Sequence, residues 1–502
     1  MKSLWLDREA RITSDPLPDG KHFDTIIAGA GLTGLVTALL LSRSGQRVAV
    51  FEARTVGAVT TGNTTGKLSL LQGGVLSSLR AQYSLKMVHA YVEANKSGQA
   101  WLTQYMDQQG IAYQRRTAVT FATSDDGGQR LRKEAAVSRD AGLDVHFSRD
   151  AGLPFHVVEA LELENQVQIN PMDVLEVLVR DIRDHGGLVV EGVQVQNVGS
   201  GQPLEVTTRK GSFTADTVVL ATGTPILDRG LYFAKLEPNR SYAAALRFPA
   251  DNKIPGGMYL SIDPPTRSQR TFPTDQGELL LVGGYGHPGG RAKSPKSHVD
   301  ALLAWAHQHY PGGEVTHTWS AQDYRATNLM PFFGKLPRGH GRILFATGYN
   351  KWGMSNGVAA ALSVTADILG GHSDWATTIH HRVTHPQGAA EAIRLNASTA
   401  KRMIDDRARV KRNPEISAET RPPEGKGVVG LYNGEPAAVS TVDGNVCMVS
   451  ASCAHLGGLL TWNDAEKSWD CPLHGSRFSP EGKYLEGPAT HNLQKPPDKK
   501  KD

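Results

Sequence analysis

The chain has 502 residues, too many for a single hydrophobic core, so two or three domains are expected. Apolar residues make up 39% and charged residues 21%, and the formal net charge of +4 argues against a basic face for nucleic acid. The sequence shows no apolar run of membrane-spanning length and no signal-peptide core, so we expect no membrane span and a cytoplasmic location.

The beginning of the chain has the pattern of a β-α-β unit. Residues 24–28 are predicted to form a buried strand, residues 32–44 a helix that is apolar nearly all round, and residues 47–52 a second strand. Because such a unit starts a parallel sheet, an α/β fold is expected here.

The middle of the chain alternates between helical and strand patterns. Helices are predicted over residues 82–108, 172–185, 298–309 and 356–369, and strands over residues 117–122, 188–198, 205–208, 212–214, 217–220 and 343–346, with short strands between 240 and 285. From 371 to 423 the chain is polar, with a charged helical stretch at 389–410, which is typical of a connector. Short strands and turns follow to about residue 493.

A glycine-rich turn directly follows the first predicted strand. Gly29, Gly31 and Gly34 form a GxGxxG pattern that opens the helix, and Glu52 ends the second strand 18 residues later. The glycines allow close approach of a pyrophosphate to the helix N-terminus, and the carboxylate can accept hydrogen bonds from ribose hydroxyls. This arrangement predicts a dinucleotide site, which either FAD or NAD could occupy.

Further motifs favour FAD. Ala221-Thr-Gly, Ala346-Thr-Gly-Tyr and Trp352-Gly-Met-Ser-Asn-Gly resemble segments of the D-amino-acid oxidase and glycine oxidase family. The resemblance implies FAD and a discontinuous domain arrangement. Because all three cysteines lie near the C-terminal end, we expect the FAD to be non-covalent, without a link to cysteine. The FAD-binding part is expected at 1–75, 160–235 and 325–372, and an interleaved antiparallel substrate domain at 76–159 and 236–324. The residues expected to bind FAD are Gly29, Gly31, Leu32, Thr33, Gly34, Glu52, Thr64, Thr65, Lys67, Val193, Thr222, Gly223, Gly348, Trp352, Gly353, Met354 and Ser355.

The three cysteines of the chain all lie near its end. Cys453-Ala-His455 and Cys471-Pro-Leu-His474 form two short Cys–His loops, the ligand pattern of a Rieske 2Fe–2S cluster. The surrounding sequence resembles Rieske domains, so we expect a connector at 373–422 and a small all-β Rieske domain at 423–497. The resemblance also implies a low potential within the Rieske range of roughly −150 to +300 mV, because Phe478 stands where other members have a tyrosine.

A flavin and a one-electron cluster in one chain suggest a dehydrogenase. The family resemblance implies oxidation of a C–N bond in a small amine or amino-acid-like substrate by hydride transfer to flavin, with electrons relayed through the cluster to an external one-electron acceptor. Candidate substrate-binding residues are Arg267, Tyr324, Arg325 and Lys351.

Three alternatives stay open. A second GxGxxG pattern at 284–289, interpreted as a loop, would support an NAD(P)H-linked reductase only weakly. The Rieske domain could instead serve as a redox sensor or structural module of a flavin oxidase. A Rieske oxygenase would need a mononuclear iron, for which His380 and His385 lack the usual preceding acid.

Overall fold

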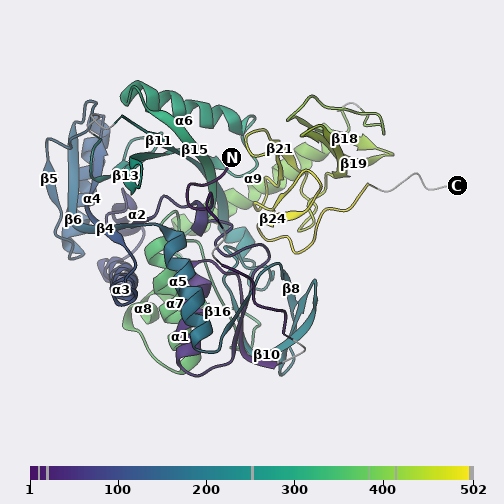
Figure 1. The fold of residues 1–502 in the computed structure, drawn as a ribbon, viewed down its shortest axis with the longest axis horizontal. Helices are drawn as coiled ribbons and strands as arrows, with labels where there is room; N and C mark the ends of the chain where they lie inside the picture. Colours follow the sequence, from purple (N-terminus) through teal and green to yellow (C-terminus); the bar gives the residue numbers. More distant parts are fainter. Residues whose placement is uncertain (10–11, 19–21, 250–253, 384, 413–414, 497–502) are drawn as a thin grey trace.

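The structure, a computed structural model, describes residues 1–9, 12–18, 22–249, 254–383, 385–412 and 415–496. Two large sheets make up most of the fold, and two small antiparallel sheets lie to one side, near the C-terminal end (Figure 1).

The first large sheet carries the predicted β-α-β unit. Its main strands run in the order β16-β17-β10-β1-β2-β7, with β1 parallel to both β2 and β10. The strands of this sheet are β1 (His22–Ala28), β2 (Val48–Phe51), β7 (Leu188–Val190), β8 (Val195–Val198), β9 (Leu204–Thr208), β10 (Gly211–Leu220), β16 (Phe332–Lys335) and β17 (Ile343–Thr347).

Four helices pack around this sheet: α1 (Leu32–Arg43), α3 (Leu85–Gln109), α5 (Pro171–Asp184) and α7 (Gly353–Leu369). Helix α1 contacts both α5 and α7, which explains why its sequence is apolar nearly all round. Helix α3 crosses α7 closely at Gly98, where a Cβ atom would lie 2.4 Å from the Ser355 carbonyl oxygen.

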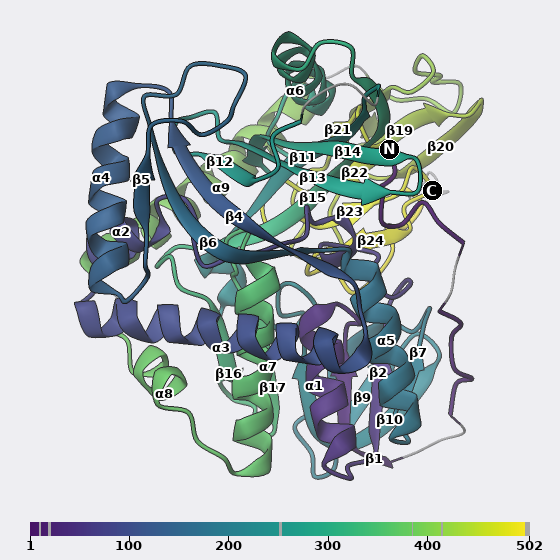
Figure 2. The ribbon, with the colours of Figure 1, turned by 60° about the vertical axis from the view of Figure 1, so that its left-hand side comes forward.

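The second large sheet lies above the first in the view of Figure 2. Its order is β15-β11-β14-β13-β12-β4-β6-β3, with β5 on β6, and neighbouring strands are antiparallel except β12 and β4. The strands are β3 (Lys67–Leu68), β4 (Tyr113–Ala122), β5 (His146–Ser148), β6 (Glu159–Ile169), β11 (Leu236–Arg247), β12 (Met258–Ser261), β13 (Arg267–Thr274), β14 (Gly277–Pro288) and β15 (Glu314–Ala326). Helices α2 (Val75–Arg80), α4 (Asp125–Asp140) and α6 (Pro295–His309) accompany it.

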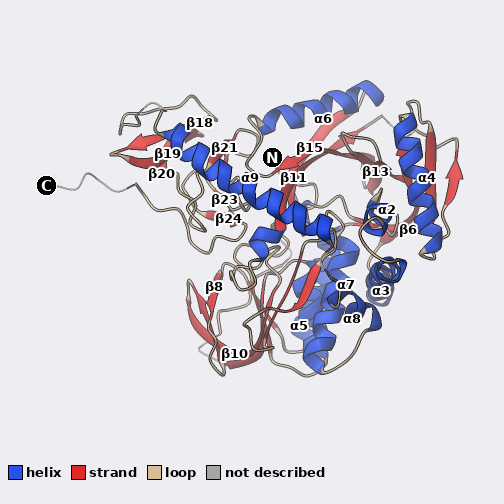
Figure 3. Ribbon diagram, turned by 180° about the vertical axis from the view of Figure 1, so that it is seen from behind, coloured by secondary structure: helices blue, strands red, loops and turns tan. Residues whose placement is uncertain are grey.

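Two helices lead to the C-terminal sheets. Figure 3 shows the long helix α9 (Pro386–Val410), which follows α8 (Asp374–His380), running from the larger part of the molecule to the small strands. One small sheet contains β18 (Gly427–Tyr432), β19 (Glu435–Val442) and β20 (Asn445–Ser450). The other contains β21 (Thr461–Asn463), β22 (Ser468–Asp470), β23 (Arg477–Phe478) and β24 (Tyr484–Glu486). This confirms the predicted α/β fold with an antiparallel second sheet and an all-β C-terminal domain.

Some elements differ from the prediction. The strand predicted over 188–198 is broken at Gly192, whose φ of 68° is left-handed. The two patterns at 212–214 and 217–220 form one strand, β10, and residues 284–288, interpreted as a loop, extend β14. The predicted segments 1–75 and 160–235 include β3 and almost all of β6, which pair within the second sheet.

Candidate functional site

A cavity of about 1390 Å³, including the space at its mouth that is open to solvent, lies at the carboxyl ends of β1, β2 and β10. In a doubly wound sheet this edge is where ligands bind. The residues that line the cavity run from Glu52 past Thr222 to the segment before α7, the places where the motifs predict contacts with a dinucleotide.

The glycine turn forms the floor of the cavity. Gly29 has a φ of 106°, and a Cβ atom there would lie 2.5 Å from the Ala221 carbonyl oxygen. A Cβ atom at Gly34 would lie 2.0 Å from the Gly29 carbonyl oxygen, so Gly34 serves the close packing of helix on strand. Gly31 lines the cavity directly, and α1 begins at the next residue, which directs the helix N-terminus at this space.

Glu52 lies where the sequence places the ribose-binding acid. Its two carboxylate oxygens accept hydrogen bonds from the backbone N–H groups of Ala30 and Arg54, each at 2.9 Å. Burial raises the pKa of the Glu52 carboxyl, and these hydrogen bonds oppose the shift. The side chain lines the cavity, so its remaining lone pairs can accept hydrogen bonds from ribose hydroxyls.

We expect Glu52→Ala to weaken FAD binding by about 1–3 kcal/mol, because hydrogen bonds to a charged acceptor are lost. The dissociation constant of FAD, measured by fluorescence on the apoprotein, checks this. Glu93→Ala, at an exposed position of α3, serves as the control. Equal FAD affinity in both variants would show that Glu52 does not hold the ribose.

Most of the expected FAD-binding residues lie at the cavity. Those that line it are Gly29, Gly31, Leu32, Thr33, Glu52, Thr64, Thr222, Gly223, Gly353 and Met354. Those outside the lining are Gly34, Thr65, Lys67, Val193, Gly348, Trp352 and Ser355. Lys67 is buried in the second sheet, where its Nζ donates to the Tyr259 carbonyl oxygen and the Ser268 hydroxyl. Its ammonium is therefore already satisfied away from the cavity.

The structure separates the four substrate candidates into two pairs. Tyr324 and Lys351 line the cavity. Arg325 pairs with Glu237 and Glu391, both at 2.8 Å, and thereby links β15 to α9. Arg267 lies between the rings of Tyr285 and Trp305, at 5.5 and 5.2 Å.

The Cys–His loops meet in the C-terminal domain. The side chains of Cys453 and Cys471 are buried and interact directly, and the imidazole rings of His455 and His474 lie 5.2 Å apart. The His455 Nδ1 atom is buried without a hydrogen-bond partner in the described part of the chain. Two neighbouring thiols and an imidazole with an unpartnered nitrogen fit the mixed ligand set of a 2Fe–2S cluster.

The larger part of the molecule covers both imidazoles. Phe233, from the short helix η2 (Tyr232–Lys235), lies 4.9 Å from the His474 ring and 5.6 Å from the His455 ring. The Nε2 atom of His455 lies 3.2 Å from a carboxylate oxygen of Asp228. The histidine side of the cluster site therefore faces the FAD-binding part.

A buried ion network joins the two parts. Arg240 of β11, which is 1% exposed, contacts Glu466 at 2.8 Å and Glu486 of β24. Arg477 of β23 contacts the same two acids and Asp470. Burial raises the pKa of the Glu466 carboxyl, but the two arginines outweigh this effect and lower the pKa to about 2. The network is therefore ionised. The network seats the C-terminal domain against the second sheet, and Tyr484, Leu485, Glu486 and Gly487 complete the cavity wall.

The sequence did not predict that the four residues from Tyr484 to Gly487 line the cavity. Tyr484 to Gly487 reach the cavity only through domain docking, which no local pattern reveals. Asp323, which lies next to the substrate candidate Tyr324, also lines the cavity, as does Tyr349 of the Ala346-Thr-Gly-Tyr motif.

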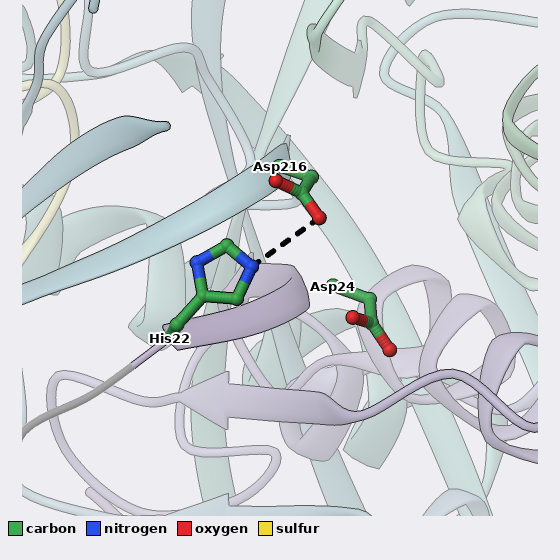
Figure 4. Close-up of side chains that lie close together, drawn as sticks. All are labelled: His22, Asp24 and Asp216. Carbon is green, nitrogen blue, oxygen red and sulfur yellow. Dashed lines mark hydrogen bonds and ion pairs between the residues drawn. The ribbon is translucent and has the colours of Figure 1, made fainter. Parts of the chain in front are cut away.

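One further cluster of metal-binding side chains lies on the first sheet. Figure 4 shows His22 facing Asp216, at 3.3 Å, with Asp24 nearby. The Asp24 carboxylate already accepts the Arg47 backbone N–H at 2.7 Å, and the group is partly exposed, so these contacts describe an ordinary surface ion pair. In the part of the chain that the structure describes, His380 and His385 belong to no group that could hold a mononuclear iron.

We expect the purified protein to contain one non-covalent FAD, two irons and two acid-labile sulfides per chain. Acid precipitation followed by absorption spectroscopy and iron analysis checks this composition. Flavin retained on the precipitate, or a third stoichiometric iron, would contradict it.

None of the helices in the described ranges combines the length and the apolar character that a membrane crossing needs.

The chain is 30% identical over 486 residues to the Rieske 2Fe–2S iron–sulfur protein YhfW of Bacillus subtilis (strain 168), covering 95% of this chain and 94% of that protein.

Solved structures share the fold of the larger part. Glycine oxidase from Geobacillus kaustophilus matches with a TM-score of 0.59 at 18% identity, over 70% of this chain and 96% of that one. L-amino acid deaminase from Proteus vulgaris matches with a TM-score of 0.60 at 14% identity, over 74% of this chain and 100% of that one.

Two family models match successive parts of the chain. Residues 24–367 match the FAD dependent oxidoreductase family, and residues 415–497 match the Rieske [2Fe-2S] domain. The cofactors of this chain are accordingly FAD and a 2Fe–2S cluster. With the cavity and the Cys–His loops in place, the chain belongs to the FAD-dependent oxidoreductases of the D-amino-acid oxidase type and carries a Rieske domain at its C-terminal end.

Proposed function

We propose that the enzyme oxidises the C–N bond of a small amine or amino acid and passes the electrons one at a time to an external acceptor. In such a reaction the C–N single bond becomes a double bond as the substrate loses a hydride equivalent and a proton. When bound, FAD takes up two electrons together and the 2Fe–2S cluster carries one at a time. The solved relatives of this fold include an oxidase of glycine and a deaminase of L-amino acids, which supports this substrate class.

One contact carries the relay part of the proposal. Gln322 Nε2 donates to the Tyr324 hydroxyl at 3.2 Å and to the Gly475 carbonyl oxygen at 2.7 Å. Tyr324 lines the cavity, and Gly475 directly follows the cluster residue His474. A single buried side chain therefore bridges the cavity wall and the second Cys–His loop.

The residues of the chain serve this reaction by holding and enclosing the reactants. The glycine turn, Glu52 and the N-terminal end of α7 would hold the dinucleotide, and Cys453, His455, Cys471 and His474 would hold the cluster. Residues of the second sheet and of β24 form part of the cavity wall, and burial on that side strengthens electrostatic contacts there. This proposal also includes the assignment of the individual binding residues, the domain limits given above and a cytoplasmic location.

An anaerobic screen of amines and amino acids tests the reaction. We expect at least one compound to bleach the visible flavin band of the oxidised protein within a single turnover. NADH and NADPH are included, because bleaching by these alone would favour the NAD(P)H-linked reductase and contradict C–N oxidation.

A further inference from the structure

The second GxGxxG pattern leads into a contact between the two parts of the molecule. Residues 284–288 extend β14, and the docking segment, residues 289–294, connects β14 to α6. The Thr461 hydroxyl of the C-terminal domain donates to the Gly290 carbonyl oxygen at 2.9 Å. The Ser294 hydroxyl donates to the Asp464 carboxylate at 2.7 Å. The docking segment is thereby fixed to the C-terminal domain at both ends.

Between these ends the docking segment meets the second Cys–His loop. Gly290 has a φ of 64°, and a Cβ atom there would lie 2.8 Å from the Pro472 backbone nitrogen, so the two backbones are in close contact. The Arg291 Nε–H group donates to the Pro472 carbonyl oxygen at 3.0 Å. Pro472 directly follows Cys471 and precedes His474 by two residues. The larger part of the molecule therefore holds an arginine against the loop that supplies half of the expected cluster ligands.

The rest of the protein leaves the guanidinium group of Arg291 incompletely satisfied. Its Nη2 atom is buried and has no hydrogen-bond partner within the residues that the structure describes. Burial lowers the pKa of Arg291, and Glu237 is foremost among the charges that oppose the shift. Glu237 itself pairs with Arg325 at 2.8 Å, so much of its negative charge is already offset. A buried cation in this state favours further negative charge nearby.

The charge of Arg291 reaches both cluster residues of the second loop. Burial is the main cause that lowers the pKa of the His474 imidazole, and the charges of His455 and Arg291 add to it. The negative charge of Cys471, in turn, raises the pKa of Arg291. An opposite charge, Asp228 beside His455, has a side chain that is 51% exposed, so water screens it more strongly than the buried Nη2 atom of Arg291.

We propose that Arg291 raises the reduction potential of the Rieske cluster from across the domain interface. One electron taken up at the cluster site adds one negative charge, and a fixed cation in a buried setting stabilises that charge. The arginine thus offsets part of the low potential that Phe478 predicts. Because Arg291 belongs to the larger part, the potential depends on how the two parts dock. This inference concerns the cluster itself and goes beyond the proposed function, because it needs neither the substrate nor the relay.

Arg291→Met removes the charge and keeps a long side chain. We expect the ratio of reduced to oxidised cluster at a fixed potential to fall about 3- to 10-fold, which lowers the midpoint potential by about 30–60 mV for one electron. An anaerobic titration of the holoenzyme with dithionite and redox mediators, followed by electron paramagnetic resonance of the reduced cluster, measures this shift. The flavin potential, from the visible band in the same titration, should stay at the parent value, because Arg291 does not line the cavity.

Two further variants separate charge from contact. Arg291→Lys keeps the charge and should keep most of the parent cluster potential. Lys293→Met removes an equal charge from an exposed position of the same docking segment and should leave the potential unchanged. Where Arg291→Met does not assemble the cluster, Arg291→Gln, which retains an N–H donor without the charge, takes its place with the same expected fall.

A parent-like cluster potential in the neutral variant would overturn the inference. So would an equal fall in Arg291→Lys or in Lys293→Met, because the effect would then not follow the charge at this position. Loss of the cluster from both Arg291→Met and Arg291→Gln would show that the side chain serves assembly of the loop, and it too would contradict the inference. Every one of these results is obtained without turnover, so failure of the proposed reaction leaves the test intact.

Discussion

Replacing His474 with alanine should abolish steady-state turnover with a one-electron acceptor and leave FAD in place. The change removes one of the imidazoles expected to hold the cluster, while the dinucleotide cavity contains no part of His474. We expect the Rieske signal to vanish in electron paramagnetic resonance. Reduction of the flavin by substrate in a single anaerobic turnover should stay near the parent rate.

His491→Ala, which changes an exposed histidine of the same domain, should behave like the parent enzyme. Steady-state turnover that survives in His474→Ala would show that the electrons leave by another way. The Rieske domain would then be a sensor or a structural module attached to a flavin oxidase.

The second large effect is expected at the buried ion network. Arg240→Ala leaves Glu466 and Glu486 facing each other with Arg477 as their remaining cation. Breaking a buried ion pair by removing one partner costs about 3–5 kcal/mol. We therefore expect the free energy of unfolding, from urea titration, to fall by about that amount, and FAD to be released more easily because β24 no longer closes the cavity.

Lys296→Ala is the control, because Lys296 and Asp300 form an exposed pair on α6 that contributes little. Parent-like stability and FAD retention in Arg240→Ala would mean that the network does not hold the C-terminal domain in position.

Local patterns predicted the parts of the site that depend on neighbouring residues. The glycine spacing after β1 and the acid at Glu52 follow from the geometry of one β-α-β unit, and the structure places them at the cavity. The two Cys–His loops are equally local, and their side chains meet as their spacing predicts.

Other features depend on pairing between distant segments. Lys67 follows a threonine-rich turn that suits a cofactor loop, but its strand β3 joins β6, and the ammonium finds acceptors on β12 and β13 instead. Asp323 carries no motif of its own, and only the docking of the segment 349–352 against β15 brings it beside Lys351 at the cavity. Docking of β24 at the cavity likewise depends on an interface between two domains.

Freeze-quenched electron paramagnetic resonance of the intact enzyme, mixed anaerobically with a compound that bleaches the flavin, tests the relay most directly. The relay predicts that the signal of the reduced Rieske cluster, with the low average g-value of mixed Cys/His ligation, grows as the flavin band changes. A flavin that is fully bleached by substrate while the cluster stays oxidised would contradict electron transfer through the Rieske domain.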